Sequence, residues 1–148
     1  LHYAGLDFLQ KKAKLLSEDD LPFLQNLVVT HSWWDTVDSL AVNPIGQVLK
    51  QNLDNRREWI TLWADTQNMW LRRTAILAQL KYKDDVDISL MELSIQKANG
   101  TNEFFLNKAI GWMLREYSKT SPDYVLHFCE KNTLNNLSKK EALRLIKK

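Results

Sequence analysis

The sequence predicts an all-α protein, and within that class an α-solenoid, a superhelix of helical repeats. Glycine and proline, 4 and 3 in 148 residues, are too scarce for an all-β chain, which needs frequent turns. Apolar residues make up 45% of the chain and recur at helical spacing, and no alternating strand pattern competes. The third observation is an internal repeat with a period in the mid-thirties. One domain over residues 1–148 is expected from this length and apolar content.

Capping residues predict where several helices begin. Ser17 with Asp20 is spaced to start a helix, and Ser138 with Glu141 forms a full capping box. The first residues, "LHYAGLDFL", have the apolar spacing of an amphipathic helix. In chain order, helices are expected near residues 1–16, 18–29, 32–42, 45–53, 54–65, 68–82, 86–99, 103–119, 122–131 and 138–147.

Two prolines and a glycine predict the interruptions. Pro22 and Pro44 mark helix beginnings or breaks, because proline lacks the amide N–H that a helix interior needs. Gly100 is placed to end a helix. A break is therefore expected at Pro44, between the helices near 32–42 and 45–53.

Cysteine usage and hydropathy bear on the compartment. The single Cys129 cannot form an intramolecular disulfide, and no apolar run is long enough for a secretory signal or a membrane span. A cytoplasmic location, in a reducing environment and without a membrane partner, is expected.

Charge is unevenly distributed along the chain. The net charge is +2, but residues 1–66 carry 6 basic and 9 acidic groups, whereas residues 67–148 carry 14 and 9. A basic surface in the later part attracts polyanions, although an excess of this size is also typical of a solvated face.

The internal repeat is visible as self-similar segments. "NMWLRRTAILAQL" overlays "NEFFLNKAIGWML" with a spacing of 34 from Ala75 to Ala109, and Ala142 follows after a further 33. "SWWDTVDSLA" fits upstream, with 36 residues from Trp34 to Trp70. Two helices per repeat at this period are typical of HEAT or armadillo solenoids, which present a long concave surface.

The repeat phase places several polar residues on one wall of that surface. Adding 36 to Asp38 gives Thr74, beside Arg73, and a further 34 gives Lys108, with Trp112 one turn on. A carboxylate, a guanidinium and an indole therefore converge there. The same helices also carry, within one or two turns, Trp34, Lys81 and Arg115.

The segment "HSWWDTVD" combines indole with negative charge. Trp34 and Asp38 are four apart, so they face the same way from one helix. This pattern indicates either a buried aromatic beside a solvated acid or a site for a cation. Packing between helices is the simpler role for the aromatics Trp33, Trp59, Trp63 and Trp70.

At this point the sequence resembles a known family. "SWWDTVD", "WLRRTAILAQL", "EFFLNKAIGWMLREY" and "LSKKEALRLI" are similar to the bacterial DNA alkylation repair enzymes, alkylpurine DNA glycosylases built from HEAT-like repeats. The resemblance runs over nearly the whole chain. Because the family domain has further helices before "YAGLDFL", residues 1–148 are expected to form a single HEAT-like repeat domain that lacks them.

The resemblance implies roles for individual residues. Trp34 and Trp112 match the family tryptophans that flank the damaged nucleotide, and Asp38 matches the catalytic aspartate. Arg73 matches an arginine that binds the DNA backbone at the lesion and acts with these three. The expected DNA-binding residues are Arg73, Lys81, Lys108 and Arg115.

The implied activity is excision of N3- and N7-alkylated purines from double-stranded DNA. Alkylation gives the purine a positive charge and weakens its glycosidic bond, so the enzyme must chiefly stabilise the oxocarbenium character of the sugar. Asp38 suits that role, and the indole faces attract cations. The resemblance also implies that the damaged base stays stacked, unlike the flipped base of most glycosylases.

Other chemistries lack support in the sequence. His2, His31 and His127 have no neighbouring Cys or His at metal-ligand spacing, and there is no P-loop or dinucleotide fingerprint, so neither a metal nor a cofactor is expected. No lysine stands out as a Schiff-base nucleophile, which favours a monofunctional glycosylase without lyase action. The protein is expected to be a monomer. The alternative is a non-catalytic HEAT-like module that binds DNA or protein.

Overall fold

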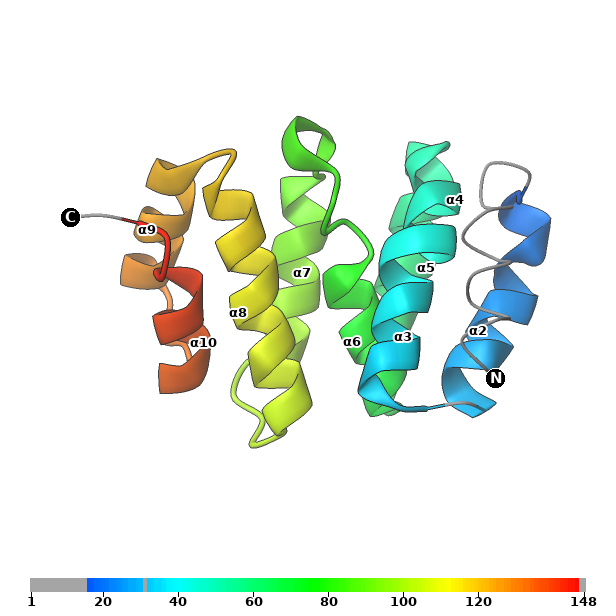
Figure 1. Ribbon diagram of the computed structural model, residues 1–148, viewed down its shortest axis with the longest axis horizontal. Helices are drawn as coiled ribbons and strands as arrows, with labels where there is room; N and C mark the ends of the chain where they lie inside the picture. The colour runs from blue at the N-terminus through cyan, green and yellow to red at the C-terminus, as the bar shows by residue number, and fades with distance from the viewer. Residues whose placement is uncertain (1–15, 31, 147–148) are drawn as a thin grey trace.

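The computed structural model describes residues 16–30 and 32–146 (Figure 1). The helix predicted near residues 1–16 therefore lies almost wholly outside the described residues. Every regular element within them is helical. In chain order these are the 3-10 turn η2 Glu18–Asp20, α2 Leu21–Thr30, α3 Trp34–Leu40, the π-turn η3 Ala41–Ile45, α4 Gly46–Lys50, α5 Leu53–Ala64, α6 Met69–Leu77, the 3-10 turn η4 Lys83–Asp85, α7 Ile88–Ala98, α8 Phe104–Ser118, α9 Pro122–Lys131 and α10 Asn136–Ala142.

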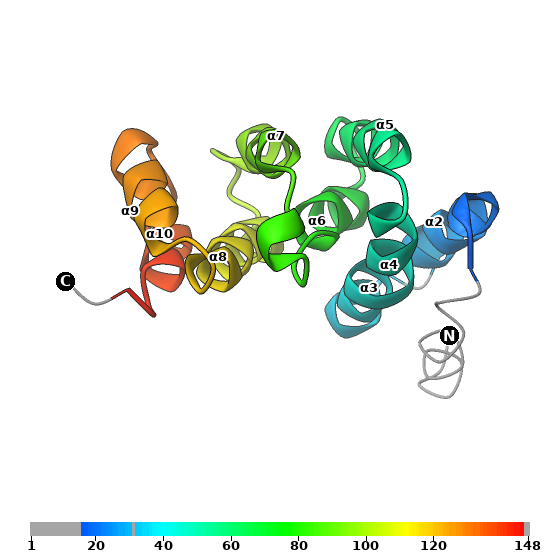
Figure 2. The ribbon, with the colours of Figure 1, turned by 90° about the horizontal axis from the view of Figure 1, so that it is seen from above.

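The helices follow one another in a row from α2 to α10 (Figure 1). Seen from above, α5, α7 and α9 form one layer and α3, α6 and α8 the other, with α10 against α8 (Figure 2). This arrangement confirms the predicted fold class, an all-α superhelix of helical repeats. In the part of the chain that the structure describes, no helix is both long and apolar enough to cross a membrane.

Helix α6 lies at the centre of the core. Leu71, Ala75 and Ala78 belong to the apolar cluster on the N-terminal side, whereas Ile76 and Leu77 belong to the one on the C-terminal side. A helix that is apolar on several faces is buried among its neighbours. The two clusters therefore meet through α6, which places its polar side chains in the middle of the molecule.

Two of the predicted boundaries are confirmed. The amide N–H of Ser17 donates to Oδ2 of Asp20 at 2.9 Å, so the pair starts the helical segment as expected. Gly100 follows the end of α7 with φ = 90°, a left-handed conformation that glycine adopts without a steric penalty.

The capping box predicted at Ser138 is wrong. Helix α10 begins earlier, and its N-cap is Asn135, whose side chain accepts from the amide of Leu137 at 2.9 Å. Ser138 is buried inside the helix, where its hydroxyl donates to the carbonyl of Asn107 at 2.7 Å. Asparagine is as good an N-cap as serine. The hydroxyl of Ser138 is instead part of the packing of α10 against α8.

The break predicted at Pro44 is also wrong. Residues 34–50 form one continuous helical run, with Pro44 inside the π-turn between α3 and α4. Proline cannot donate to the carbonyl of Leu40 and its ring crowds that group. A π-turn widens the helix by one residue and accommodates the ring without ending the helix.

Gly46 sits where α4 crosses the end of α6. A Cβ at this position would lie 2.7 Å from the carbonyl oxygen of Ala78 and 3.0 Å from that of Ala41. The carbonyl of Gly46 itself accepts the hydroxyl of Tyr82. Burial raises the pKa of this hydroxyl, an effect that the nearby Arg56 partly opposes, and keeps it a donor. The missing side chain therefore sets the approach of the two helices.

Replacing Gly46 with Ala is expected to lower the free energy of unfolding by about 1–3 kcal/mol, because backbone atoms must move apart to admit the methyl group. Denaturant unfolding measures this loss. Gln47→Ala, at the adjacent exposed position of α4, is the matched control and is expected to change stability by less than about 0.5 kcal/mol. Equal stability of both variants would contradict the steric role of Gly46.

Candidate functional site

A buried ion pair joins α3 to α6. Nε of Arg73 donates to Oδ1 of Asp38 at 2.7 Å, and Nη2 donates to Oδ2 at 2.9 Å, so the contact is bidentate. Asp38 is 7% exposed and Arg73 is 3% exposed. The remaining nitrogen of Arg73, Nη1, donates to the backbone carbonyl of Phe105 on α8. One guanidinium on α6 therefore binds α3 and α8, through residues that lie 35 and 32 positions from Arg73 in the sequence.

This pair fixes the Asp38 carboxylate in place. A buried carboxylate without its partner carries an uncompensated charge, and so does a buried guanidinium. Both oxygens of Asp38 accept from Arg73, which fixes the orientation of the carboxylate. Three of the five N–H groups of Arg73 donate to these protein oxygens, one from each nitrogen, and its side chain is 4% exposed.

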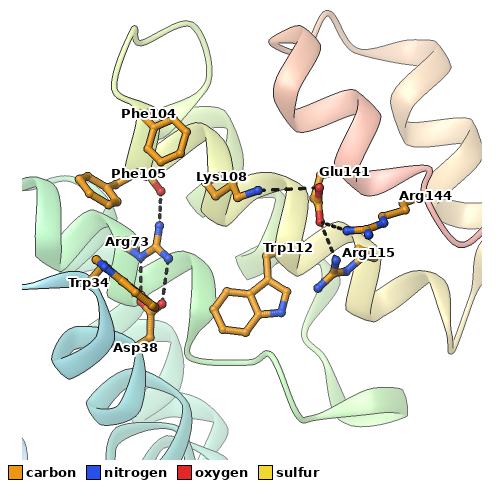
Figure 3. Close-up of a pocket in the computed structure, with 10 residues that line it drawn as sticks. All are labelled: Trp34, Asp38, Arg73, Phe104, Phe105, Lys108, Trp112, Arg115, Glu141 and Arg144. Carbon is orange, nitrogen blue, oxygen red and sulfur yellow. Dashed lines mark hydrogen bonds and ion pairs between the residues drawn. The ribbon is translucent and has the colours of Figure 1, made fainter.

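The ion pair opens onto a pocket of about 430 Å³ (Figure 3). Six of the residues singled out from the sequence line it, so the structure brings the predicted wall together. The lining residues are Trp34, Asp38, Arg73, Phe104, Phe105, Lys108, Trp112, Arg115, Glu141 and Arg144.

Lys81 lies beside this pocket, not in it. It follows α6, and its Nζ donates to Oδ1 of Asn43 at 3.3 Å. Lys81 lines an adjoining cavity of about 230 Å³. Asp38 and Trp112 line both cavities and therefore lie between them. Lys81 is exposed, so its charge faces solvent next to the pocket.

The tryptophans differ in their surroundings. Trp34 is exposed at the pocket, whereas Trp112 is half-buried against the C-terminal core. Trp63 is fully buried, as expected of a packing aromatic, and its indole N–H donates to Gln25 at 2.7 Å. Trp33 also packs between helices, against the rings of Trp70 and Phe105, but it is not a core residue, because 57% of it is exposed.

The aromatic surface near the pocket is larger than the sequence suggested. Trp33 has its ring centroid 6.0 Å from that of Phe105, and Trp70 lies 5.2 Å from the same ring. Phe104 is exposed and packs edge-on against Phe105 at 5.4 Å. Together these rings extend the apolar wall of the pocket beyond Trp34.

Sequence reasoning missed four lining residues: Phe104, Phe105, Glu141 and Arg144. Phe104, Lys108 and Trp112 are four apart in succession on α8, so helical spacing alone places Phe104 on the same face. The spacing of 33 that relates Ala109 to Ala142 also relates Lys108 to Glu141. Both signals were present in the sequence.

The pocket combines two opposite chemistries. The Asp38 carboxylate and the indoles suit a cation or a group that develops positive charge, whereas Lys108, Arg115 and Arg144 suit an anion. Among the described residues, no group of three or more His, Cys, Asp or Glu side chains is placed to hold a metal ion.

Comparisons with known proteins agree on one family. The family model described as "DNA alkylation repair enzyme" matches residues 1–146. A solved structure titled "Predicted DNA alkylation repair enzyme from Enterococcus faecalis" is similar with a TM-score of 0.92 and 29% sequence identity, over 99% of this chain and 68% of that chain. No curated protein matches the chain. The chain belongs to the DNA alkylation repair enzyme family.

Proposed function

We propose that the protein is a monofunctional DNA glycosylase. It hydrolyses the N-glycosidic bond of N3- and N7-alkylated purines in double-stranded DNA, the first step of base excision repair of alkylation damage. The observation that supports this most strongly is the Asp38 carboxylate, held by Arg73 in a pocket that Trp34 and Trp112 also line (Figure 3).

Asp38 stabilises the positive charge that develops as the bond breaks. The C1′–N bond breaks, its electron pair leaves with the purine, and the sugar gains oxocarbenium character. A carboxylate already fixed in position lowers the energy of this state without reorganising. It also orients the water that attacks C1′. Because both its oxygens accept from Arg73, Asp38 acts mainly through its charge.

Trp34 and Trp112 hold the damaged nucleotide. Indole faces attract cations by about 0.5–2 kcal/mol each, and an alkylated purine carries a formal positive charge. Trp34 presents an exposed ring and Trp112 a half-buried one, so one ring is free to meet the nucleotide and the other is fixed by packing.

The basic residues bind the phosphate backbone on either side of the lesion. Lys108 and Arg115 line the pocket, and Lys81 lies beside it. Arg73 offers its two remaining N–H groups to a phosphate at the lesion. Such backbone contacts position the duplex without reading its sequence, and an open pocket does not require the base to leave the stack.

A lyase reaction fits this site less well than hydrolysis does. It needs a neutral amine that attacks C1′ to form a Schiff base. Lys108 is the one lysine among the described residues that line the pocket, and its Nζ lies 3.9 Å from an oxygen of Glu141. Hydrolysis by water is therefore the proposed reaction.

The second candidate is a helical-repeat module that binds DNA without catalysis. The observation in its favour is the ion pair itself, because a buried Arg73–Asp38 contact also serves to lock three helices. Release of free 7-methylguanine from methylated duplex DNA, followed by chromatography, separates the two candidates, because a binding module releases none.

Asp38→Asn removes the charge and keeps the shape of the side chain. Single-turnover excision is expected to fall by about 100-fold or more, because the lost interaction is made in the transition state. Since Arg73 then lacks its counter-charge, the assay is run below the thermal midpoint of the variant. Unchanged excision by folded Asp38→Asn protein would rule out the catalytic role.

Arg73→Gln leaves the Asp38 carboxylate buried and unpaired. The free energy of unfolding is expected to fall by about 3–5 kcal/mol, measured by denaturant unfolding. Lys81→Gln is the matched control at an exposed cation, with a change below about 0.5 kcal/mol. An equally small loss in Arg73→Gln would show that the ion pair does not hold the site together.

A further inference from the structure

Glu141, which was expected only to cap a helix and has no part in the proposed mechanism, forms ion pairs with three cations in the pocket. Oε1 lies 2.5 Å from Nη1 of Arg115 and 3.4 Å from Nη1 of Arg144, and Oε2 lies 3.9 Å from Nζ of Lys108. The side chain of Glu141 is 15% exposed, the least of the four. Figure 3 shows its carboxylate at the meeting point of these three side chains.

The chain brings Glu141 to this position through a close contact between α8 and α10. A Cβ on Gly111 would lie 2.7 Å from Cβ of Glu141 and 3.1 Å from the carbonyl oxygen of Ser138. The buried hydroxyl of Ser138 donates to the carbonyl of Asn107, one turn earlier on α8. The glycine and the serine together place the carboxylate inside the pocket.

The same three cations have the composition of a phosphate-binding site. Two guanidinium groups and an ammonium group are the donors that bind phosphate oxygens best. Arg144 is exposed and Lys108 and Arg115 are half-exposed, so all three are within reach of an incoming polyanion. Glu141 accepts one N–H from each arginine and lies within ion-pair distance of the ammonium group, where a phosphodiester oxygen would otherwise bind.

Glu141 also sets the net charge of the pocket. Asp38 and Arg73 neutralise each other, which leaves Lys108, Arg115 and Arg144 against one carboxylate. The charged side chains that line the pocket therefore sum to +2, and without Glu141 they would sum to +3. The carboxylate lowers the attraction for any DNA backbone, damaged or not.

We propose that Glu141 is a specificity-determining residue that competes with the phosphodiesters of duplex DNA for Lys108, Arg115 and Arg144. Its charge weakens the hold on undamaged duplex. The positive charge of a lesion adds an attraction to Asp38 and the indoles, which undamaged DNA lacks, so the damaged duplex is retained selectively. The part that concerns the lesion rests on the proposed function, whereas the competition for phosphate does not.

The test is the affinity of Glu141→Gln for an undamaged duplex, measured by fluorescence anisotropy between 50 and 200 mM salt. Binding is expected to be about 3- to 10-fold tighter at the low-salt end. The plot of log K against log salt concentration is expected to be steeper by up to about 0.9, the value for one more neutralised phosphate.

The matched control is Asp65→Asn, which removes one carboxylate from a different pair. Asp65 follows α5 and lies 3.0 Å from Nζ of Lys97 on α7, in the layer away from the pocket. Asp65→Asn changes the net charge of the protein by the same amount as Glu141→Gln. Its affinity for the duplex is nevertheless expected to stay within about twofold of that of the unaltered protein. A gain as large as that of Glu141→Gln would mean that only the total charge matters and would overturn the proposal.

A double variant separates competition from a merely structural contact. In an Arg115→Gln background, Glu141→Gln is expected to give a smaller gain in affinity, because one of the competed donors is gone. Glu141→Asp withdraws the carboxylate by one methylene and is expected to give an intermediate gain, which also serves if Glu141→Gln does not fold. Unchanged or weaker binding by a folded Glu141 variant would show that Glu141 only positions Arg115.

Discrimination is tested with a duplex that carries one pyrrolidine abasic-site analogue, a stable cation in place of the sugar. The ratio of its affinity to that of undamaged duplex is expected to fall in Glu141→Gln. These affinity measurements do not depend on excision of a base. The absence of 7-methylguanine release would therefore overturn the glycosylase proposal alone. An unchanged affinity for undamaged duplex would overturn the role of Glu141 alone.

Discussion

The bidentate contact between Arg73 and Asp38 is the interaction on which the site depends. It lies in the middle of the molecule, on the helix that both halves of the core share, and through the carbonyl of Phe105 it reaches α8 as well. The desolvation of each charge is offset only in the presence of the other. The pair therefore holds α3, α6 and α8 at one spacing, and that spacing brings Trp34 and Trp112 to the same pocket.

Both carboxylates that line the pocket are held by arginines, with different consequences. Asp38 is buried and paired with one guanidinium, so its position is fixed. Glu141 is partly exposed and meets three cations, so it balances the charge of the basic wall. The pocket therefore holds two fixed carboxylates within a wall that is otherwise cationic, which is the arrangement that the proposed function uses.

Two glycines control how closely the helices beside this site approach. Gly46 admits the carbonyl of Ala78, and Gly111 admits the side chain of Glu141. Both lie inside helices, where glycine is less favourable than alanine by about 1 kcal/mol. Their cost is offset by the close contact each one allows, which is a property of packing between repeats and is invisible in the local sequence.

The sequence by itself determined the helices and the repeat phase, because both depend on periodicities that operate over a few residues or one repeat. That phase was sufficient to place Asp38, Arg73, Lys108 and Trp112 on one wall, and it contained the signal for Glu141 as well.

Only the tertiary structure decided the start of α10, the continuous helix through Pro44 and the exposed position of Trp33. It also decided that Arg73 donates from all three of its nitrogens to protein oxygens, an internal role that the sequence resemblance did not give. These outcomes depend on which groups meet when helices from different repeats come within hydrogen-bonding distance. Such distances are set by close packing between repeats, which no pattern along a single helix contains.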